Sequence, residues 1–372
     1  MPNLFDWIDK LFREQNRQMA WGCIPPERVI GGGPQPAFKP NDDYVTVRLG
    51  SMFLRDSREL WLKLSPLVHA TVGQRGRVAP RSDSAVIGPA QFGDLATAPA
   101  ERSVVLNQRL SGPAVWRGGD LDIAAGLFAV PKDQAAAALL ETLGQLSALG
   151  IPGLTQGLEI ARIVKSGVEG LIGLNGTRPV LGVKVSLSET GSAQPCWLAG
   201  VAASEGDVAM DQLWVRDGRL YSGPSAQQLQ PLETHDHLLI AVERGLPRQD
   251  WRGLPALTPH EAKFAEVLRD TAADDAALRQ RMNQAFLAFD ADLAAEEGLS
   301  DPDKKRIRAE VAADLGRRLK ERSDPLGAAA PAETRSVGGV ARRRPRATEF
   351  NFLDVSDLPP GGAPLAPGAA PF

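Results

Sequence analysis

Residues 211–223 read DQLWVRDGRLYSG and contain the clearest turn signal in the sequence. The pair Asp217-Gly218 separates two short strand-like runs, LWVR and RLYS. An Asp-Gly pair in this position favours a two-residue hairpin turn, because both turn positions need a positive φ. This segment therefore predicts two antiparallel strands joined directly to each other.

Similar short runs lie on both sides of this hairpin. Val183, Val185 and Leu187 alternate with polar residues, and PCWLAGVAA and DHLLIAVERG add two more apolar runs before residue 245. Residues 43–125 repeat the pattern, starting with YVTVRLGSMFL. Short alternating runs between Gly and Pro turns indicate antiparallel sheets rather than βαβ units. We predict an antiparallel β-sandwich, C2-like or jelly-roll-like, over residues 43–250. A single sandwich is favoured over two separate ones, and neither arrangement is excluded.

Helical patterns occupy three other regions. Apolar residues at helical spacing predict an amphipathic helix over residues 1–20 and a helical hairpin inserted at 132–174. Residues 255–322 predict a helical bundle, with helices near 259–272, 274–296 and 301–322. Thr258, Pro259 and Glu261 have the form of a capping box, and Ser300 is the expected cap of the last helix. The fold class is therefore α+β.

The expected buried stripes of two of these helices can be stated residue by residue. The stripe of the second helix comprises Leu278, Met282, Phe286, Phe289 and Leu293, and that of the third comprises Ile307, Val311, Leu315 and Leu319.

Composition excludes several classes of protein. The 372 residues contain 42 Lys and Arg against 45 Asp and Glu, so no basic excess remains for nucleic-acid binding. The chain contains no apolar run long enough for a stable membrane span, and its start does not resemble a signal peptide. A cytoplasmic location is expected. Cys23 and Cys196 are interpreted as two separate thiols, with no local signature of catalysis.

Two short motifs are candidates for a metal ion. His235 and His237 form the only close histidine pair, and Asp120 and Asp122 follow the glycine turn of WRGGDLD. An H-x-H pair can supply two zinc ligands and an Asp-x-Asp pair can supply part of a calcium site. Each needs further ligands, so the favoured interpretation is a polar start to a strand, with both aspartates facing solvent. No other cofactor is indicated.

The C-terminal residues 323–372 are rich in Ala, Pro and Gly, and this composition predicts a disordered tail. An arginine cluster and a short apolar segment interrupt it. Apolar residues within a disordered segment are typical of docking elements that fold on a partner, and flexible basic chain is a common protease target. The predicted partner-binding residues are Arg342, Arg343, Arg344, Arg346, Phe350, Phe352 and Leu353.

Residues 115–122, VWRGGDLD, lead into GLFAV and a Leu- and Ala-rich helix. Across about residues 100–245 the chain resembles a group of bacterial proteins associated with multi-gene defence or signalling loci. This resemblance implies a structural or adaptor role that depends on a protein partner encoded nearby, and it supplies no catalytic residues.

The preferred hypothesis is thus a non-enzymatic interaction scaffold or adaptor that binds a partner through its helices and its tail. Oligomerisation is compatible with this role. Two alternatives remain open. The first is a metal-dependent enzyme or calcium-binding sandwich, and the second is a structural component of a phage-tail-like or secretion assembly.

Overall fold

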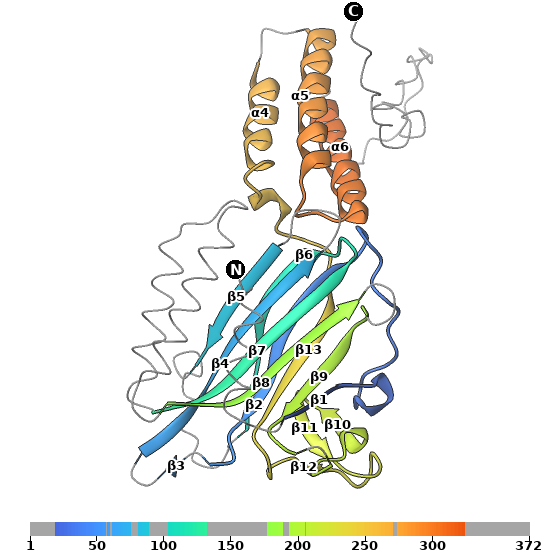
Figure 1. The fold of residues 1–372 in the computed structure, drawn as a ribbon. Helices are drawn as coiled ribbons and strands as arrows, with labels where there is room; N and C mark the ends of the chain where they lie inside the picture. Colours follow the sequence, from blue (N-terminus) through green and yellow to red (C-terminus); the bar gives the residue numbers. More distant parts are fainter. Residues whose placement is uncertain are drawn as a thin grey trace, which may run out of the picture. The chain divides into compact units, whose positions relative to one another are not determined.

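The computed structural model describes residues 19–56, 58–59, 62–75, 81–88, 103–131, 177–188, 193–204, 206–270 and 274–323. The protein is a mixed α+β chain with antiparallel sheets followed by C-terminal helices (Figure 1). It divides into two compact units, with the boundary between Pro247 and Arg248. The predicted hairpin at 132–174, all but the last two residues of the predicted helix 1–20, and all of the predicted tail except Ser323 lie outside the described residues.

Three sheets make up the first unit. One five-stranded sheet has the order β1-β9-β13-β2-β6, and a second has the order β3-β4-β7-β8 with β5 also paired to β4. A small sheet has the order β10-β11-β12. The strands are β1 (Ala20–Ile24), β2 (Tyr44–Phe53), β3 (Arg58–Glu59), β4 (Leu62–Arg75), β5 (Arg81–Ile87), β6 (Ser103–Val115), β7 (Asp120–Pro131), β8 (Arg178–Ser188), β9 (Cys196–Val201), β10 (Leu213–Arg216), β11 (Arg219–Ser222), β12 (Gln230–Pro231) and β13 (His237–Gly245).

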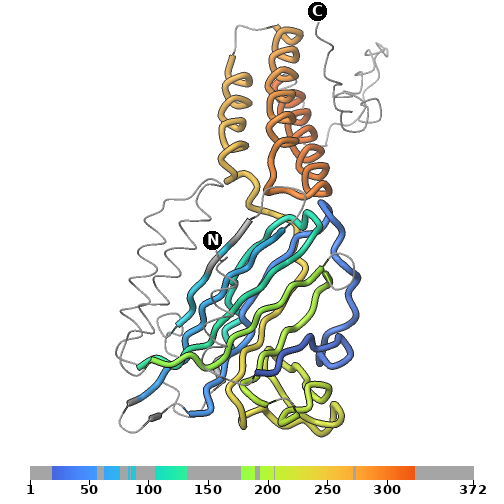
Figure 2. Tube along the Cα trace, in the orientation of Figure 1, coloured from blue at the N-terminus to red at the C-terminus, as the bar shows by residue number. Residues whose placement is uncertain are grey.

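All pairings between these strands are antiparallel, as predicted. Figure 2 shows the course of the chain through the strands. The predicted hairpin is confirmed: β10 pairs with β11, and Asp217 and Gly218 have φ values of 52° and 70°. One buried apolar cluster contains residues of both five-stranded sheets, such as Val47 of β2, Ile123 of β7 and Val183 of β8. A second cluster joins the small sheet to β9 and β13.

The pattern of β2 shows how a local irregularity keeps its side chains in the core. Val45, Val47 and Leu49 belong to the shared cluster, but the next members are Met52 and Leu54, so the alternation shifts by one residue. The register with β6 and β13 shifts at the same place, as a β-bulge would cause. An extra residue therefore returns apolar side chains to the buried face.

Strand β1 was not predicted, and Ala20 lies in it rather than in a helix. It is a five-residue edge strand that pairs with β9, directly before a segment rich in Pro and Gly. Edge strands are commonly short, and prolines that follow one do not disrupt it.

The second unit contains α4 (Thr258–Arg269), α5 (Asp275–Ala295) and α6 (Asp301–Ser323). Both predicted stripes are buried, and together with Trp251, Leu257, Phe264 and Leu299 they form one cluster. Ser300 caps α6 as predicted, since its Oγ accepts from the Asp303 amide at 3.4 Å.

The predicted capping box of α4 is wrong. Thr258 lies within the helix, and its hydroxyl donates to the carbonyl oxygens of Arg252 (3.1 Å) and Leu254 (2.9 Å). The preceding turn continues from the 3₁₀-helix η6 (Trp251–Gly253) into α4, so a backbone carbonyl is available to that hydroxyl.

Candidate functional sites

The acidic candidates Asp120 and Asp122 lie at the start of β7. Asp122 is buried, and the guanidinium of Arg75 on β4 donates to it at 2.9 Å and forms an ion pair with it. The expectation that both aspartates face solvent is therefore wrong for Asp122. Arg75 lies opposite Asp120 in the register of β4 and β7, so this corner of the sheet already contains a cation.

The two candidate histidines have different surroundings. His235 precedes β13, and its Nδ1 lies 2.9 Å from the Thr234 hydroxyl. His237 begins β13, is buried, and stacks on Phe53 with ring centroids 5.1 Å apart. Burial lowers the pKa of His237 to about 4. Within the described part of the chain, no group of three or more His, Cys, Asp or Glu side chains is arranged to hold a metal ion.

The predicted partner-binding residues of the tail, 342–353, lie outside the described residues. The helices that the structure describes include none that is both long and apolar enough to cross a bilayer.

The structure brings together two residues that sequence reasoning treated separately. Cys23 of β1 pairs in register with Leu198, and Cys196 is two residues away on the same strand, β9. Because side chains two apart point to the same face, the two thiols are diagonal neighbours. No local motif signals this pair, since 172 residues separate the two cysteines in the sequence.

The two thiols affect each other electrostatically. A hydrogen bond from the Cys196 thiol lowers the pKa of Cys23 to about 7, while the same hydrogen bond and burial raise the pKa of Cys196. Cys23 is exposed and Cys196 is half-buried. Since the thiolate is the nucleophile, Cys23 is the more reactive thiol of the two near neutral pH.

A small cavity of about 110 Å³ lies beside Cys196. Trp197, Val242 and Glu243 line it together with residues of the segment that follows β1, among them Pro26, Gly32 and Gly33. Cys196 thus lies next to both Cys23 and this cavity.

The second unit presents a different feature on α5. Its residues Gln284, Leu287, Ala288, Ala291 and Ala295 recur at spacings of three and four and are all exposed. We call these five residues the α5 outer face. It bears no charge, and Leu287 is 53% exposed. Such spacing places the residues on one side of the helix, opposite the buried stripe.

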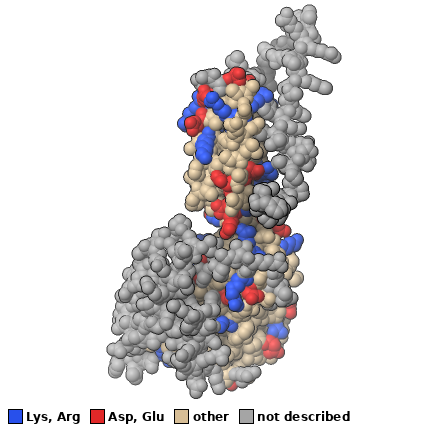
Figure 3. Space-filling model, turned by 45° about the horizontal axis from the view of Figure 1, so that its top comes forward, with Lys and Arg blue, Asp and Glu red and all other residues tan. Residues whose placement is uncertain are grey.

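The exposed residues of α4 and α6 are mostly charged. Glu261, Lys263, Glu266 and Arg269 are exposed on α4, and Lys305, Glu310, Arg317, Lys320 and Glu321 are exposed on α6. Basic and acidic side chains are interspersed on the side of this unit shown in Figure 3. The uncharged α5 outer face thus differs from the surfaces of both neighbouring helices.

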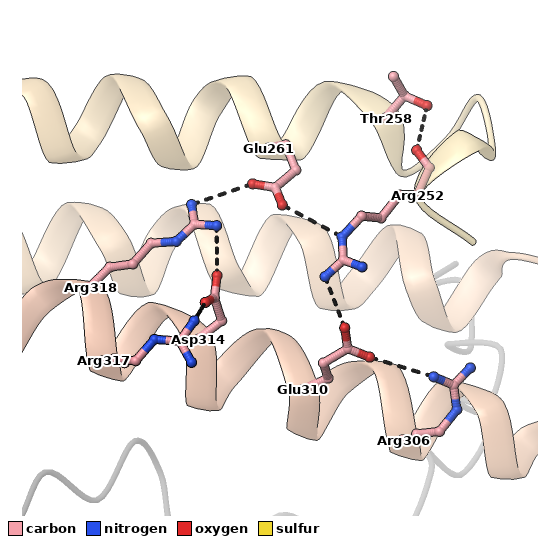
Figure 4. A network of polar contacts seen from close by, with 8 residues as sticks. All are labelled: Arg252, Thr258, Glu261, Arg306, Glu310, Asp314, Arg317 and Arg318. Atoms are coloured by element: carbon pink, nitrogen blue, oxygen red, sulfur yellow. Dashed lines mark hydrogen bonds and ion pairs between the residues drawn. The ribbon is translucent and has the colours of Figure 1, made fainter. Parts of the chain in front are cut away.

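Glu261 of α4 and Glu310 of α6 belong to one network of charges that joins the two helices (Figure 4). Arg252 contacts Glu261 (3.8 Å) and Glu310 (2.9 Å). Arg318 contacts Glu261 (3.6 Å) and Asp314 (2.7 Å), and Arg306 contacts Glu310 (3.5 Å). Because these charges are paired within the unit, they contribute to holding its helices together.

Comparison of the sequence with family models and with curated proteins finds no match. The geometry above is therefore the basis for the functional argument.

Proposed function

We propose that the protein is a non-enzymatic adaptor whose helical unit binds an α-helix of a partner protein. The α5 outer face is the observation that carries this proposal. A surface of alanines with one exposed leucine allows another helix to approach closely and to bury apolar area without leaving a charge unpaired.

The flanking side chains favour the same occupant. Asp292, next to this face, hydrogen-bonds to Nε2 of the buried His260 at 2.8 Å. A charge beside the face thus already has a partner within the unit. An acidic or basic peptide would find no opposite charge on the α5 outer face, whereas an apolar helix needs none.

The first unit supplies the framework in this proposal. We infer that its two five-stranded sheets are the two layers of a β-sandwich, because one apolar cluster includes residues of both.

The resemblance to proteins of bacterial multi-gene loci favours a cytoplasmic adaptor for defence or signalling, with its partner encoded nearby. The tail residues 342–353 are proposed as a second docking element and protease target.

The test is affinity purification of the full chain and two variants from the cells that produce it. Leu287→Arg places a charge on the α5 outer face, and Ala313→Arg places the same charge on the exposed surface of α6. We expect Leu287→Arg to lose a co-purifying protein that wild type and Ala313→Arg retain.

A 1–325 truncation separates the helices from the tail. A partner that binds the Leu287→Arg variant but not the truncation would assign docking to the tail and contradict the role of α5. Metal analysis of the same samples tests the metal-dependent alternative, for which a stoichiometric metal ion is the required result.

A further inference from the structure

The two cysteines lie where two antiparallel strands meet at the edge of a sheet. Among the described strands, β1 has β9 as its only neighbour in the sheet, and Cys196 is the first residue of β9. Cys23 is one residue from the end of β1. The ends of an edge strand can move more easily than its centre, so the two sulfurs can approach to bonding distance.

The surroundings give the two thiols different roles. Cys23 is exposed and accepts a hydrogen bond from Cys196, which stabilises the Cys23 thiolate. Cys196 is half-buried and is one of the residues that line the 110 Å³ cavity. An exposed nucleophile beside a second, less exposed thiol is the arrangement of a redox-sensitive dithiol.

We propose that Cys23 and Cys196 form a reversible intramolecular disulfide when the protein meets a low-molecular-weight disulfide such as oxidised glutathione. This site goes beyond the proposed adaptor function and does not depend on it. A disulfide in a cytoplasmic protein is usually of this transient, sensing kind.

The chemistry proceeds in two exchanges. The Cys23 thiolate attacks one sulfur of the oxidant, which breaks the oxidant's S–S bond and releases one glutathione thiolate that takes up a proton. Cys196 then loses its proton and attacks the Cys23 sulfur, which forms the protein disulfide and releases the second glutathione. The protein loses two protons and two electrons, and one glutathione disulfide becomes two glutathione thiols.

Oxidation would attach the edge strand covalently to the sheet. Ile24, next to Cys23, belongs to the cluster that joins the small sheet to β9 and β13. The segment that follows β1 lines the cavity beside Cys196. The disulfide therefore restricts the opening of β1 and of the segment that follows it.

The experiment equilibrates the purified full chain with mixtures of reduced and oxidised glutathione at pH 7. The reaction is quenched with acid, and the remaining thiols are alkylated and counted by mass spectrometry. Because the chain contains only two cysteines, any intramolecular disulfide is the one proposed. We expect both thiols to disappear together, with the protein remaining a monomer. The effective concentration of one cysteine thiol for the other should be at least about tenfold higher in buffer than in urea.

Single variants test the two roles. Cys196→Ser should retain one glutathione on Cys23, and Cys23→Ser should react at least about tenfold more slowly. A glutathione adduct that persists on wild-type protein, a covalent dimer, or equal effective concentrations in buffer and urea would each overturn the proposal. The comparison of buffer with urea uses wild-type protein alone, so it tests the proposed disulfide even where a variant fails to fold.

Discussion

At the scale of single residues, two buried histidines have the clearest physical consequence. His69 of β4 and His237 of β13 are each almost fully buried, and burial lowers the pKa of each from 6.5 to about 4. The Nε2 atoms of both have no hydrogen-bond partner among the described residues. Both rings are therefore neutral in the folded protein at neutral pH.

This burial predicts that the β-rich unit loses stability in mild acid. Between pH 6.5 and about 4 the unfolded chain binds protons at these histidines and the folded chain does not. The free energy of unfolding should therefore be highest above pH 6.5 and fall as the pH approaches 4, by up to roughly 3 kcal/mol for each histidine. Urea unfolding followed by tryptophan fluorescence at several pH values measures this slope.

A variant with both histidines replaced is the matched control. His69→Leu with His237→Leu removes the two titratable groups, so most of the dependence in this range should disappear, although the His235 carbonyl loses its contact with His237 Nδ1. A slope that the double variant leaves unchanged would show that other groups cause the acid sensitivity.

At the scale of elements, the sequence predicted what local periodicity determines. The hairpin at Asp217-Gly218, the buried stripes of α5 and α6 and the Ser300 cap are all confirmed. Strand β1 was missed because it has no alternation of its own and forms by pairing with β9. The prediction of a capping box at Thr258 was wrong because the preceding turn continues into the helix. That turn depends on the conformation of residues 251–257, which the capping motif does not contain.

The hairpin turn gives a prediction with a matched pair of variants. Gly218 has a φ of 70°, whereas Gly253 is not in the left-handed region and has open space around its Cα. Gly218→Ala should lower the free energy of unfolding by about 1 kcal/mol, since a Cβ disfavours this conformation. Gly253→Ala should leave it nearly unchanged. Equal effects in chemical denaturation would argue against the positive-φ turn.

At the scale of the whole molecule, the chain has two units with separate cores. Phe289 lies at the centre of the helical core and contacts the rings of Trp251, His260 and Phe264. Phe289→Ala should destabilise the helical unit by about 3–5 kcal/mol, because it leaves a cavity in that core. Thermal unfolding should then show an earlier loss of helical circular dichroism with an unchanged transition for the sheets.

Leu287 on the same helix is the natural control for this prediction. It is exposed, so Leu287→Ala should change stability by no more than about 0.5 kcal/mol. If Phe289→Ala shifted both transitions together, the two units would not unfold independently.

The candidate sites show the limits of a single sequence. The adaptor hypothesis rested on the lack of a catalytic motif and on segments typical of partner binding, but the α5 outer face becomes visible only once the burial of each helix face is known. The Cys23–Cys196 pair needs the register of β1 against β9, which no local pattern contains. The aspartates were expected to face solvent because the partner of Asp122, Arg75, lies on a different strand.

The most direct test of the proposed adaptor function is site-specific photocrosslinking in the cells that produce the protein. A crosslinking amino acid replaces Gln284 on the α5 outer face or, as the control, the exposed Lys320 on α6. We predict a discrete crosslinked species from position 284 alone, with the crosslink mapped by mass spectrometry to a helical segment of one partner protein. Crosslinks from position 320 only, or none from position 284, would contradict docking on α5.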